Sequence, residues 1–251
     1  MPFVVGEHPK RGATASLLTA LDRAGASIIE VGIPFSDPIA DGPVIAQAMH
    51  AALEAGATPL TVFNQVASVR DVVKAGLVAM CSMSIVWRMG GAAGFASAAR
   101  EAGFDGLIIP DAPLEESGEI LSAADGCGLT CSLLVAPSTP PDRAAAIARA
   151  STGFVYLLAR AGITGEQTDA PRIEEPVAAL RAVTNLPIAC GFGISKPEHV
   201  REVVRHADAA IVGSALVRRI EQARDARLDP AAAAEAFVRE LAAGLPTPKS
   251  G

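Results

Sequence analysis

The feature that most limits the possible folds of this chain is a regular alternation of short apolar runs with alanine-rich stretches. The alternation predicts parallel strands joined by crossover helices, and uninterrupted apolar runs such as 133–135 are typical of strands buried on both faces. We expect strands at 3–6, 27–32, 77–83, 106–110, 130–136, 153–158, 187–189 and 209–212. We expect helices near 14–24, 43–55, 59–74, 92–102, 116–126, 140–150, 173–183, 197–206, 215–226 and 230–243.

Eight strand–helix units in a chain of 251 residues favour a single domain folded as a closed (β/α)8 TIM barrel of the α/β class. A weak internal repeat supports this prediction. Residues 23–30 and 101–108 both join a helix end to an apolar strand through a glycine that can turn left-handed. An open, doubly wound sheet is the alternative, but the sequence lacks the G-x-G-x-x-G motif of dinucleotide-binding sheets. We expect the domain to span 1–251, with 245–251 as a flexible tail.

Composition argues against several classes of function. The 21 basic and 27 acidic residues give a net charge of −6 without a basic stripe, so nucleic acid is not an expected partner. Apolar runs stay shorter than the ~18 residues of a membrane span, and the first residues lack the pattern of a signal peptide. We therefore expect a cytoplasmic protein with no membrane partner. The four cysteines show no C-x-x-C or zinc-ligand spacing, so we expect buried thiols and no metal site.

Three carboxylates gather around the end of the second expected strand, where a barrel places its chemistry. Glu30 interrupts the apolar run 28–33, and burial there would raise its pKa and suit it to acid–base work. A buried partner that neutralises Glu30 is the alternative. The proline-rich loop 34–43 carries Asp37 and Asp41, which could instead cap a turn and a helix N-terminus. The pattern indicates a pair of acid–base groups at one mouth of the barrel.

Glycine-containing segments follow the last three strands. They are 162–165, 191–195 and 213–215. Glycine lets backbone N–H groups approach an anion closely, and a helix beginning near Ser214 would aim its N-terminus at the same place. Each segment taken singly reads as an ordinary turn, but three at consecutive strand ends predict a phosphate site.

The run from Glu30 to Pro43 resembles the signature of the tryptophan synthase alpha subunit family, and the resemblance extends over nearly the whole chain. It implies a lyase that cleaves indole-3-glycerol phosphate to indole and glyceraldehyde 3-phosphate in tryptophan biosynthesis. By the same resemblance, Glu30 and Asp41 are the catalytic pair. The implied phosphate contacts are Gly165, Gly193, Gly213 and Ser214. The implied walls of the indole pocket, which would otherwise be taken as barrel core, are Phe3, Ile45, Ile108, Val135, Tyr156, Thr164 and Phe192.

The resemblance also implies a partner. The family's alpha subunit pairs with a beta subunit in an α2β2 heterotetramer, and pyridoxal phosphate belongs to the beta subunit, so no cofactor is expected in this chain. Asp37, Pro38 and Pro113 correspond to positions that face that partner. The loop that follows Gly165, as far as Pro171, corresponds to a lid over the substrate.

The sequence departs from the family pattern in several places. Glu7-His8-Pro9 replaces a Gly-Asp-Pro, Ala46 replaces a glutamine, and 81–87 lacks the usual aromatic and asparagine. We also expect the family's N-terminal capping helix to be missing, so that the barrel bottom is capped differently. The altered segment 81–87 keeps open a free-standing lyase that releases indole. A second alternative is a catalytically weak phosphate-binding barrel that activates a partner, against which the presence of both Glu30 and Asp41 argues. A Schiff-base aldolase is disfavoured because Lys10, Lys74, Lys196 and Lys249 all lie outside the expected strands.

Overall fold

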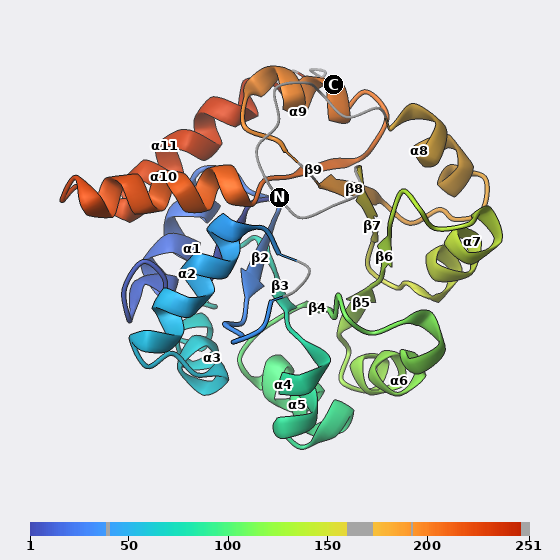
Figure 1. The fold of residues 1–251 in the computed structure, drawn as a ribbon, viewed down its shortest axis with the longest axis horizontal. Helices are drawn as coiled ribbons and strands as arrows, with labels where there is room; N and C mark the ends of the chain where they lie inside the picture. Colours follow the sequence, from blue (N-terminus) through green and yellow to red (C-terminus); the bar gives the residue numbers. More distant parts are fainter. Residues whose placement is uncertain (39–40, 160–172, 192, 247–251) are drawn as a thin grey trace.

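The computed structural model describes residues 1–38, 41–159, 173–191 and 193–246, and its strands form a central ring inside a layer of helices (Figure 1). The strands are β1 (Phe3–Val5), β2 (Ile28–Gly32), β3 (Gly76–Met80), β4 (Gly106–Ile108), β5 (Thr130–Ser132), β6 (Leu134–Val135), β7 (Val155–Leu158), β8 (Ile188–Gly191) and β9 (Ala209–Ile211). The helices are α1 (Ala13–Arg23), α2 (Pro43–Glu54), α3 (Pro59–Ala67), α4 (Met83–Arg88), α5 (Gly91–Glu101), the 3-10 turn η1 (Leu114–Glu116), α6 (Gly118–Gly126), α7 (Pro141–Ala150), α8 (Glu174–Arg181), α9 (Pro197–Val203), α10 (Ser214–Asp225) and α11 (Pro230–Ala242).

All described strands pair in parallel, and two short links close the ring. One sheet runs from β1 to β5 and the other from β6 to β9. β5 and β6 are consecutive pieces of the expected strand 130–136, interrupted at Leu133, whose carbonyl accepts from Tyr156 N at 3.1 Å. At the other seam, Phe3 N donates to the Val212 carbonyl and Val212 N donates to the Met1 carbonyl, both at 2.9 Å. The expected (β/α)8 barrel is therefore confirmed.

Side-chain alternation along β2 decides which groups reach the barrel interior. Ile29 and Val31 pack in the large hydrophobic core that also contains the surrounding helices. Glu30 and Gly32 therefore face inward. A side chain at position 32 would collide with the ring of Phe3, because a Cβ on Gly32 would stand 2.6 Å from that ring. β2 thus delivers one carboxylate into an apolar interior.

The turns before the strands follow the sequence prediction. Gly25 and Gly103, which occupy equivalent places in the internal repeat, adopt φ values of 86° and 91°. These values lie in the left-handed region that glycine occupies without strain. The chain turns in this way from α1 toward β2 and from α5 toward β4, which confirms the repeat as a structural unit.

Three expected elements are wrong in their extent. The expected helix 59–74 ends at Ala67, as α3. The expected strand 77–83 ends at Met80, and Met83 begins the short helix α4. The cause is local hydrogen bonding, because the hydroxyl of Ser82 accepts from Ser84 N at 3.2 Å and Asp111 accepts from Met83 N at 2.8 Å. The expected helix 116–126 divides into η1 and α6.

The strand beginnings surround a cavity at one end of the barrel. It holds about 1090 Å³ of empty space, counted to its mouth, and Ile28, Phe154, Val212 and Leu241 are among its apolar walls. Within the described ranges, no helix is long and apolar enough to cross a membrane. The same part of the chain contains no group of three or more His, Cys, Asp or Glu that could hold a metal ion.

Candidate active site

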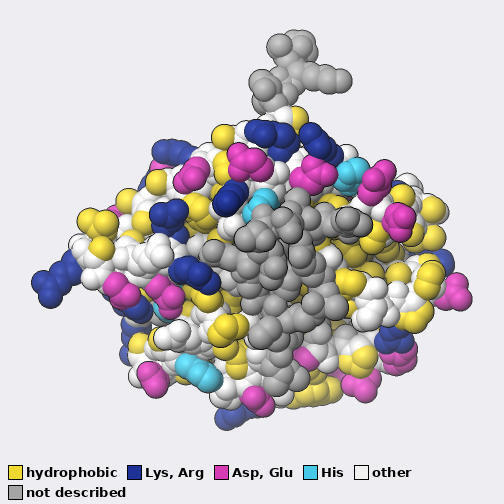
Figure 2. Space-filling model, turned by 45° about the horizontal axis from the view of Figure 1, so that its top comes forward, with side chains coloured by type: hydrophobic (Ala, Val, Ile, Leu, Met, Phe, Trp, Pro, Cys, Tyr) yellow, Lys and Arg dark blue, Asp and Glu magenta, His cyan; other side chains and the backbone are white. Residues whose placement is uncertain are grey.

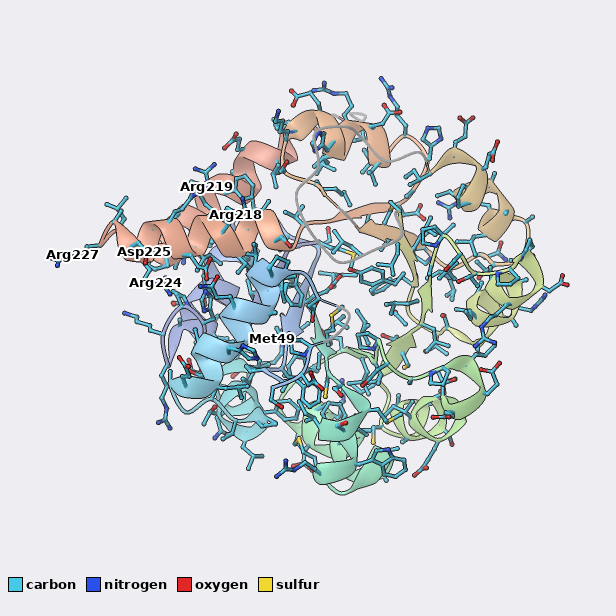
Figure 3. All side chains as sticks on the ribbon, in the orientation of Figure 1. Met49, Arg218, Arg219, Arg224, Asp225 and Arg227 are labelled. Atoms are coloured by element: carbon cyan, nitrogen blue, oxygen red, sulfur yellow. The ribbon has the colours of Figure 1, made fainter. Side chains whose placement is uncertain are left out.

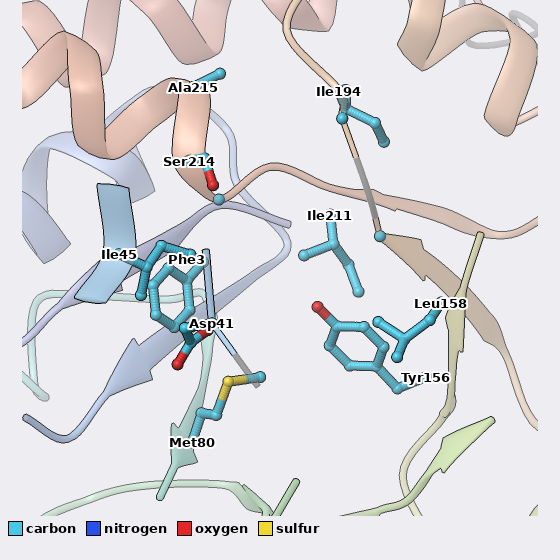
Figure 4. A pocket seen from close by; sticks show the side chains of 13 residues that line it. Phe3, Asp41, Ile45, Met80, Tyr156, Leu158, Ile194, Ile211, Ser214 and Ala215 are labelled. Carbon is cyan, nitrogen blue, oxygen red and sulfur yellow. The ribbon is translucent and has the colours of Figure 1, made fainter. Parts of the chain in front are cut away.

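A pocket opens where the strands end, which is the end of a barrel at which enzymes of this fold carry their active sites. It encloses about 530 Å³ of empty space, counted to its open mouth. Figure 4 shows its lining side chains, with Asp41 and Tyr156 on opposite sides and Ser214 at the start of α10. The described residues that line it are Phe3, Asp41, Ile45, Met80, Tyr156, Leu158, Gly191, Gly193, Ile194, Ile211, Gly213, Ser214 and Ala215. The lining is mostly apolar, with a few polar groups that converge on it, as is typical of a small-molecule site.

Glu30 lies inside the barrel, below this lining. Its side chain is fully buried, and neither carboxylate oxygen has a hydrogen-bond partner among the described residues. Burial raises the pKa of Glu30 to about 8, although the positive charge of the Met1 amino group opposes the shift. Among the described residues, Glu30 therefore has no hydrogen-bonded partner that neutralises it, and the Met1 amino group only reduces the upward pKa shift. Glu30 is held protonated at neutral pH, in a form that can give up a proton.

Asp41 stands at the rim of the same pocket. The helix that follows it, α2, takes Gly42 as its N-cap residue, so the structure does not support the capping role considered for Asp41. Burial raises the pKa of Asp41 to about 6. The two carboxyl groups therefore differ in the pH at which they ionise, and near pH 7 Glu30 is protonated while Asp41 is charged. Two titratable groups tuned apart in this way suit divided acid and base roles.

The phenol of Tyr156 is influenced electrostatically by both carboxyl groups. Its ring is buried on β7 and lines the pocket, and its hydroxyl oxygen would stand 3.0 Å from a Cβ on Gly191. Burial raises the pKa of the Tyr156 phenol well above its usual value, and the charges of Glu30 and Asp41 raise it further. Both carboxyl groups therefore lie within electrostatic reach of one phenol at the pocket wall.

The opposite side of the pocket has the features of an anion site. The twelve-residue helix α10 begins at Ser214. The buried Ser214 hydroxyl has no hydrogen-bond partner among the described residues. Gly193 adopts a φ of 73°, which only glycine takes readily. A Cβ on Gly213 would lie in ordinary contact with Ile45, 3.6 Å away, so this backbone forms part of the pocket wall. Free amides and a helix N-terminus are suited to holding a phosphate group.

Cationic side chains do not contribute to the described lining of the pocket. Figure 3 shows Arg224 and Arg227 at the outer end of α10, away from the barrel axis. On the face that Figure 2 shows, acidic and basic side chains are interspersed rather than gathered in a field of one sign. Among the described residues, the groups that could hold an anion beside Ser214 are the helix terminus, backbone amides and the Ser214 hydroxyl.

The residues predicted from sequence are distributed unevenly around this pocket. Phe3, Ile45, Asp41, Tyr156, Gly193, Gly213 and Ser214 line it. Ile108 belongs to the interior cluster beneath it and Val135 to the large core, so the structure places neither in the described lining. Gly165, Thr164 and Phe192, and the loop from Gly165 to Pro171, lie outside the described residues.

Several lining residues were missed by the sequence reasoning. The missed residues are Met80, Leu158 and Ile211, whereas Gly191, Ile194 and Ala215 fall within the predicted segments 191–195 and 213–215. The available signal was strand alternation: Met80 is two residues beyond the inward-facing Val78, and Leu158 is two beyond Tyr156. Counting inward positions to the end of each strand would have found them.

The positions expected to face a partner subunit lie on loops at the same end of the barrel. Asp37 is exposed and Pro38 half-buried in the loop after β2. Pro113 is exposed in the loop after β4, directly before η1. These loops follow strands that are separated in the sheet by β3 alone among the described strands.

Comparisons with known proteins agree with this geometry. A family model described as tryptophan synthase alpha chain matches residues 1–246. The tryptophan synthase alpha chain of Chloroflexus aggregans is 44% identical over 243 residues, which are 96% of this chain and 90% of the relative. A Mycobacterium tuberculosis tryptophan synthase structure superposes with a TM-score of 0.87 at 35% identity, covering 97% of this chain and 90% of that one. A structure of the tryptophan synthase α2β2 complex of Pyrococcus furiosus, described as mutually activated, superposes with a TM-score of 0.83 at 32% identity, covering 96% and 95%.

Proposed function

The chain belongs to the tryptophan synthase alpha chain family, and from that premise we propose that Glu30 and Asp41 carry out its acid–base chemistry. The reaction of the family is the lyase step of tryptophan biosynthesis, in which indole-3-glycerol phosphate is cleaved to indole and glyceraldehyde 3-phosphate. The observation that supports the assignment is that the buried Glu30 carboxyl and the Asp41 carboxyl, whose pKa values burial raises to about 8 and about 6, accompany a pocket that is also lined by Ser214 at the N-terminus of α10.

Glu30 acts first as the acid. Its proton is transferred to C3 of the indole ring, which makes the ring an electron-accepting indolenine. The resulting carboxylate then takes the proton of the hydroxyl group on the neighbouring glycerol carbon. The electrons of the C–C bond return to the ring as the aldehyde forms, so Glu30 is protonated again at the end of the cycle. A pKa of about 8 suits a group that must both donate and accept near neutral pH.

Asp41 acts on the ring nitrogen. As a carboxylate it accepts a hydrogen bond from the indole N–H and stabilises the positive charge that protonation of C3 places on the ring. Its pKa of about 6 keeps it ionised at the pH at which Glu30 is still protonated. Phe3, Ile45 and Tyr156 provide apolar contacts for the ring on either side.

The phosphate group of the substrate is held by Gly193, Gly213 and Ser214. The Ser214 hydroxyl, which lacks a partner in the described structure, donates to a phosphate oxygen, and the first amides of α10 do the same. Gly165 is a further proposed contact, on the family resemblance. Holding the phosphate fixes the scissile bond between the two carboxyl groups, and such positioning supplies part of the rate enhancement.

The chain functions with a beta subunit as the alpha part of an α2β2 complex, and Asp37, Pro38 and Pro113 are our proposed contacts to that partner. Family membership supports the expectation that this chain needs no cofactor, and pyridoxal phosphate is expected in the beta subunit. A cytoplasmic location is proposed because the reaction belongs to amino-acid biosynthesis. Binding of the beta subunit is expected to raise the cleavage rate several-fold.

The test is release of indole from indole-3-glycerol phosphate, measured with and without a beta subunit. Glu30→Gln and Asp41→Asn should each lower turnover by about 10²- to 10⁴-fold, which is the usual contribution of a positioned acid or base. Glu54→Gln, a change at an exposed position at the end of α2, is the matched control and should leave turnover unchanged. Near-normal turnover in either active-site variant, with a native circular dichroism spectrum, would remove that residue from the mechanism.

A further inference from the structure

A second pocket adjoins the active site beneath the loop after β2. It encloses about 440 Å³ of empty space, counted to its mouth. Asp41 and Met80 line both pockets, so the two spaces lie against the same two side chains. The described residues that line the second pocket are Ile33, Phe35, Asp37, Pro38, Asp41, Met49, Met80, Cys81, Ser82, Pro110 and Asp111.

The floor of this second pocket is apolar. Ile33, Met49 and Cys81 are buried there, and Figure 3 labels Met49 on α2. Burial and the neighbouring Asp111 charge raise the pKa of the Cys81 thiol well above its usual value, so Cys81 presents an uncharged wall.

Carboxylates surround the apolar floor. Besides Asp41, Asp37 and Asp111 also line the pocket. Asp111 accepts hydrogen bonds from Ser82 Oγ at 2.7 Å and from Met83 N at 2.8 Å, which fixes its position. Lys and Arg do not occur among the described lining residues. The pocket therefore suits a small apolar group and disfavours an anionic one.

We propose that the second pocket is a substituent subsite, which receives a small uncharged group on the nitrogen side of the six-membered ring of the indole substrate. The proposal rests on the proposed role of Asp41. A ring whose N–H is bound by Asp41 presents its nitrogen-side edge to Asp41, which lines both pockets together with Met80. A group at position 6 can then pass beside the unbranched, flexible Met80 into the apolar space. A group at position 4 lies on the C3 side of the ring, away from Asp41 and the second pocket.

Binding of uncleavable analogues tests the subsite separately from the chemistry. The probes are indole-3-propanol phosphate and its 6-methyl, 4-methyl and 6-carboxy derivatives, with dissociation constants from calorimetry on the whole chain. Burial of one methyl group corresponds to about a fourfold tighter Kd. We expect the 6-methyl analogue to bind about fourfold more tightly than the parent compound, and the 4-methyl and 6-carboxy analogues at least tenfold more weakly.

Two substitutions in the second pocket should shift this selectivity in opposite directions. Cys81→Leu fills the space and should raise the ratio of the 6-methyl Kd to the parent Kd at least tenfold. Met49→Ala enlarges the space and should improve binding of a 6-ethyl analogue relative to the parent. Each ratio is taken within one variant, so a general loss of stability cannot produce opposite shifts.

The outcomes separate the subsite from the proposed function. Equal ratios in the wild type and in Cys81→Leu would overturn the subsite, as would tighter binding of the 4-methyl than of the 6-methyl analogue. Selective binding without cleavage of indole-3-glycerol phosphate would leave the subsite in place and remove the catalytic assignment. Failure of the parent analogue to bind would overturn both.

Discussion

The burial of Glu30 should destabilise the protein at and above neutral pH, and Glu30→Gln should relieve that cost. Folding raises the pKa of this carboxyl from 4.5 to about 8. The native state therefore keeps a proton that the unfolded chain has lost, and stability falls as pH rises from 4.5 to 8. Each pH unit corresponds to about 1.4 kcal/mol, so the cost is about 3 kcal/mol at pH 7 and reaches about 5 kcal/mol above pH 8. Glutamine, which cannot ionise, escapes it.

The assay is unfolding by urea and by heat at several pH values from 5 to 9, with Glu54→Gln as the exposed control. At pH 7, about 3 kcal/mol corresponds to a rise of about 6–12 °C in Tm for a protein of this size. The advantage of Glu30→Gln over the wild type should shrink toward zero as pH falls to 4.5, while the control shows no such trend. An advantage that is constant from pH 5 to pH 8 would refute the reasoning, because it would arise from packing and not from a buried ionisable group.

Three further results are expected from the same geometry. The pH profile of kcat/KM should rise through about 6 as Asp41 ionises and fall through about 8 as Glu30 loses its proton, and Asp41→Asn should abolish the rising limb in any residual activity. Gly213→Asp should weaken binding of glycerol 3-phosphate at least tenfold while Gly213→Ala, which has room for its methyl group, weakens it much less; equal affinities for both would place the anion elsewhere. Burial, and to a smaller extent the Arg224 charge, lower the pKa of His8 from 6.5 to about 4. Protonation of His8 should therefore lower the free energy of unfolding by up to about 3 kcal/mol as pH falls from 6.5 to 4. In His8→Asn, acid titration of stability should lack this loss.

Local patterns in the sequence predicted the parts of this molecule that local physics determines. The alternation of runs predicted the strands and helices, and glycines such as Gly25 were correctly placed at left-handed turns. An isolated glutamate in an apolar run predicted a buried carboxyl, since strand periodicity turns Glu30 inward with Gly32. These inferences need only a residue and its near neighbours in the chain.

Features that depend on distant residues could not be predicted in this way. The strand that ends at Met80 stops early because Asp111, which lies 28 residues beyond Met83, fixes the start of α4. The missing hydrogen-bond partners of Glu30 follow from what the other strands supply to the interior. The second pocket brings together side chains from distant parts of the chain, among them Met49 on α2, Cys81 after β3 and Asp111 after β4. None of these contacts leaves a periodic trace in the sequence.

The phosphate side of the pocket should show the same conflict between function and stability as Glu30. The Ser214 hydroxyl is buried without a partner in the described structure, and such a group costs about 1–3 kcal/mol when unsatisfied. Ser214→Ala removes the unsatisfied group, so it should raise the Tm of the unliganded protein and at the same time weaken binding of glycerol 3-phosphate. The two effects have opposite signs because the ligand supplies the missing hydrogen-bond partner. If Ser214→Ala lowered the Tm without ligand, the hydroxyl would already have a partner in the folded protein, and its proposed role in holding the phosphate would lose its main support.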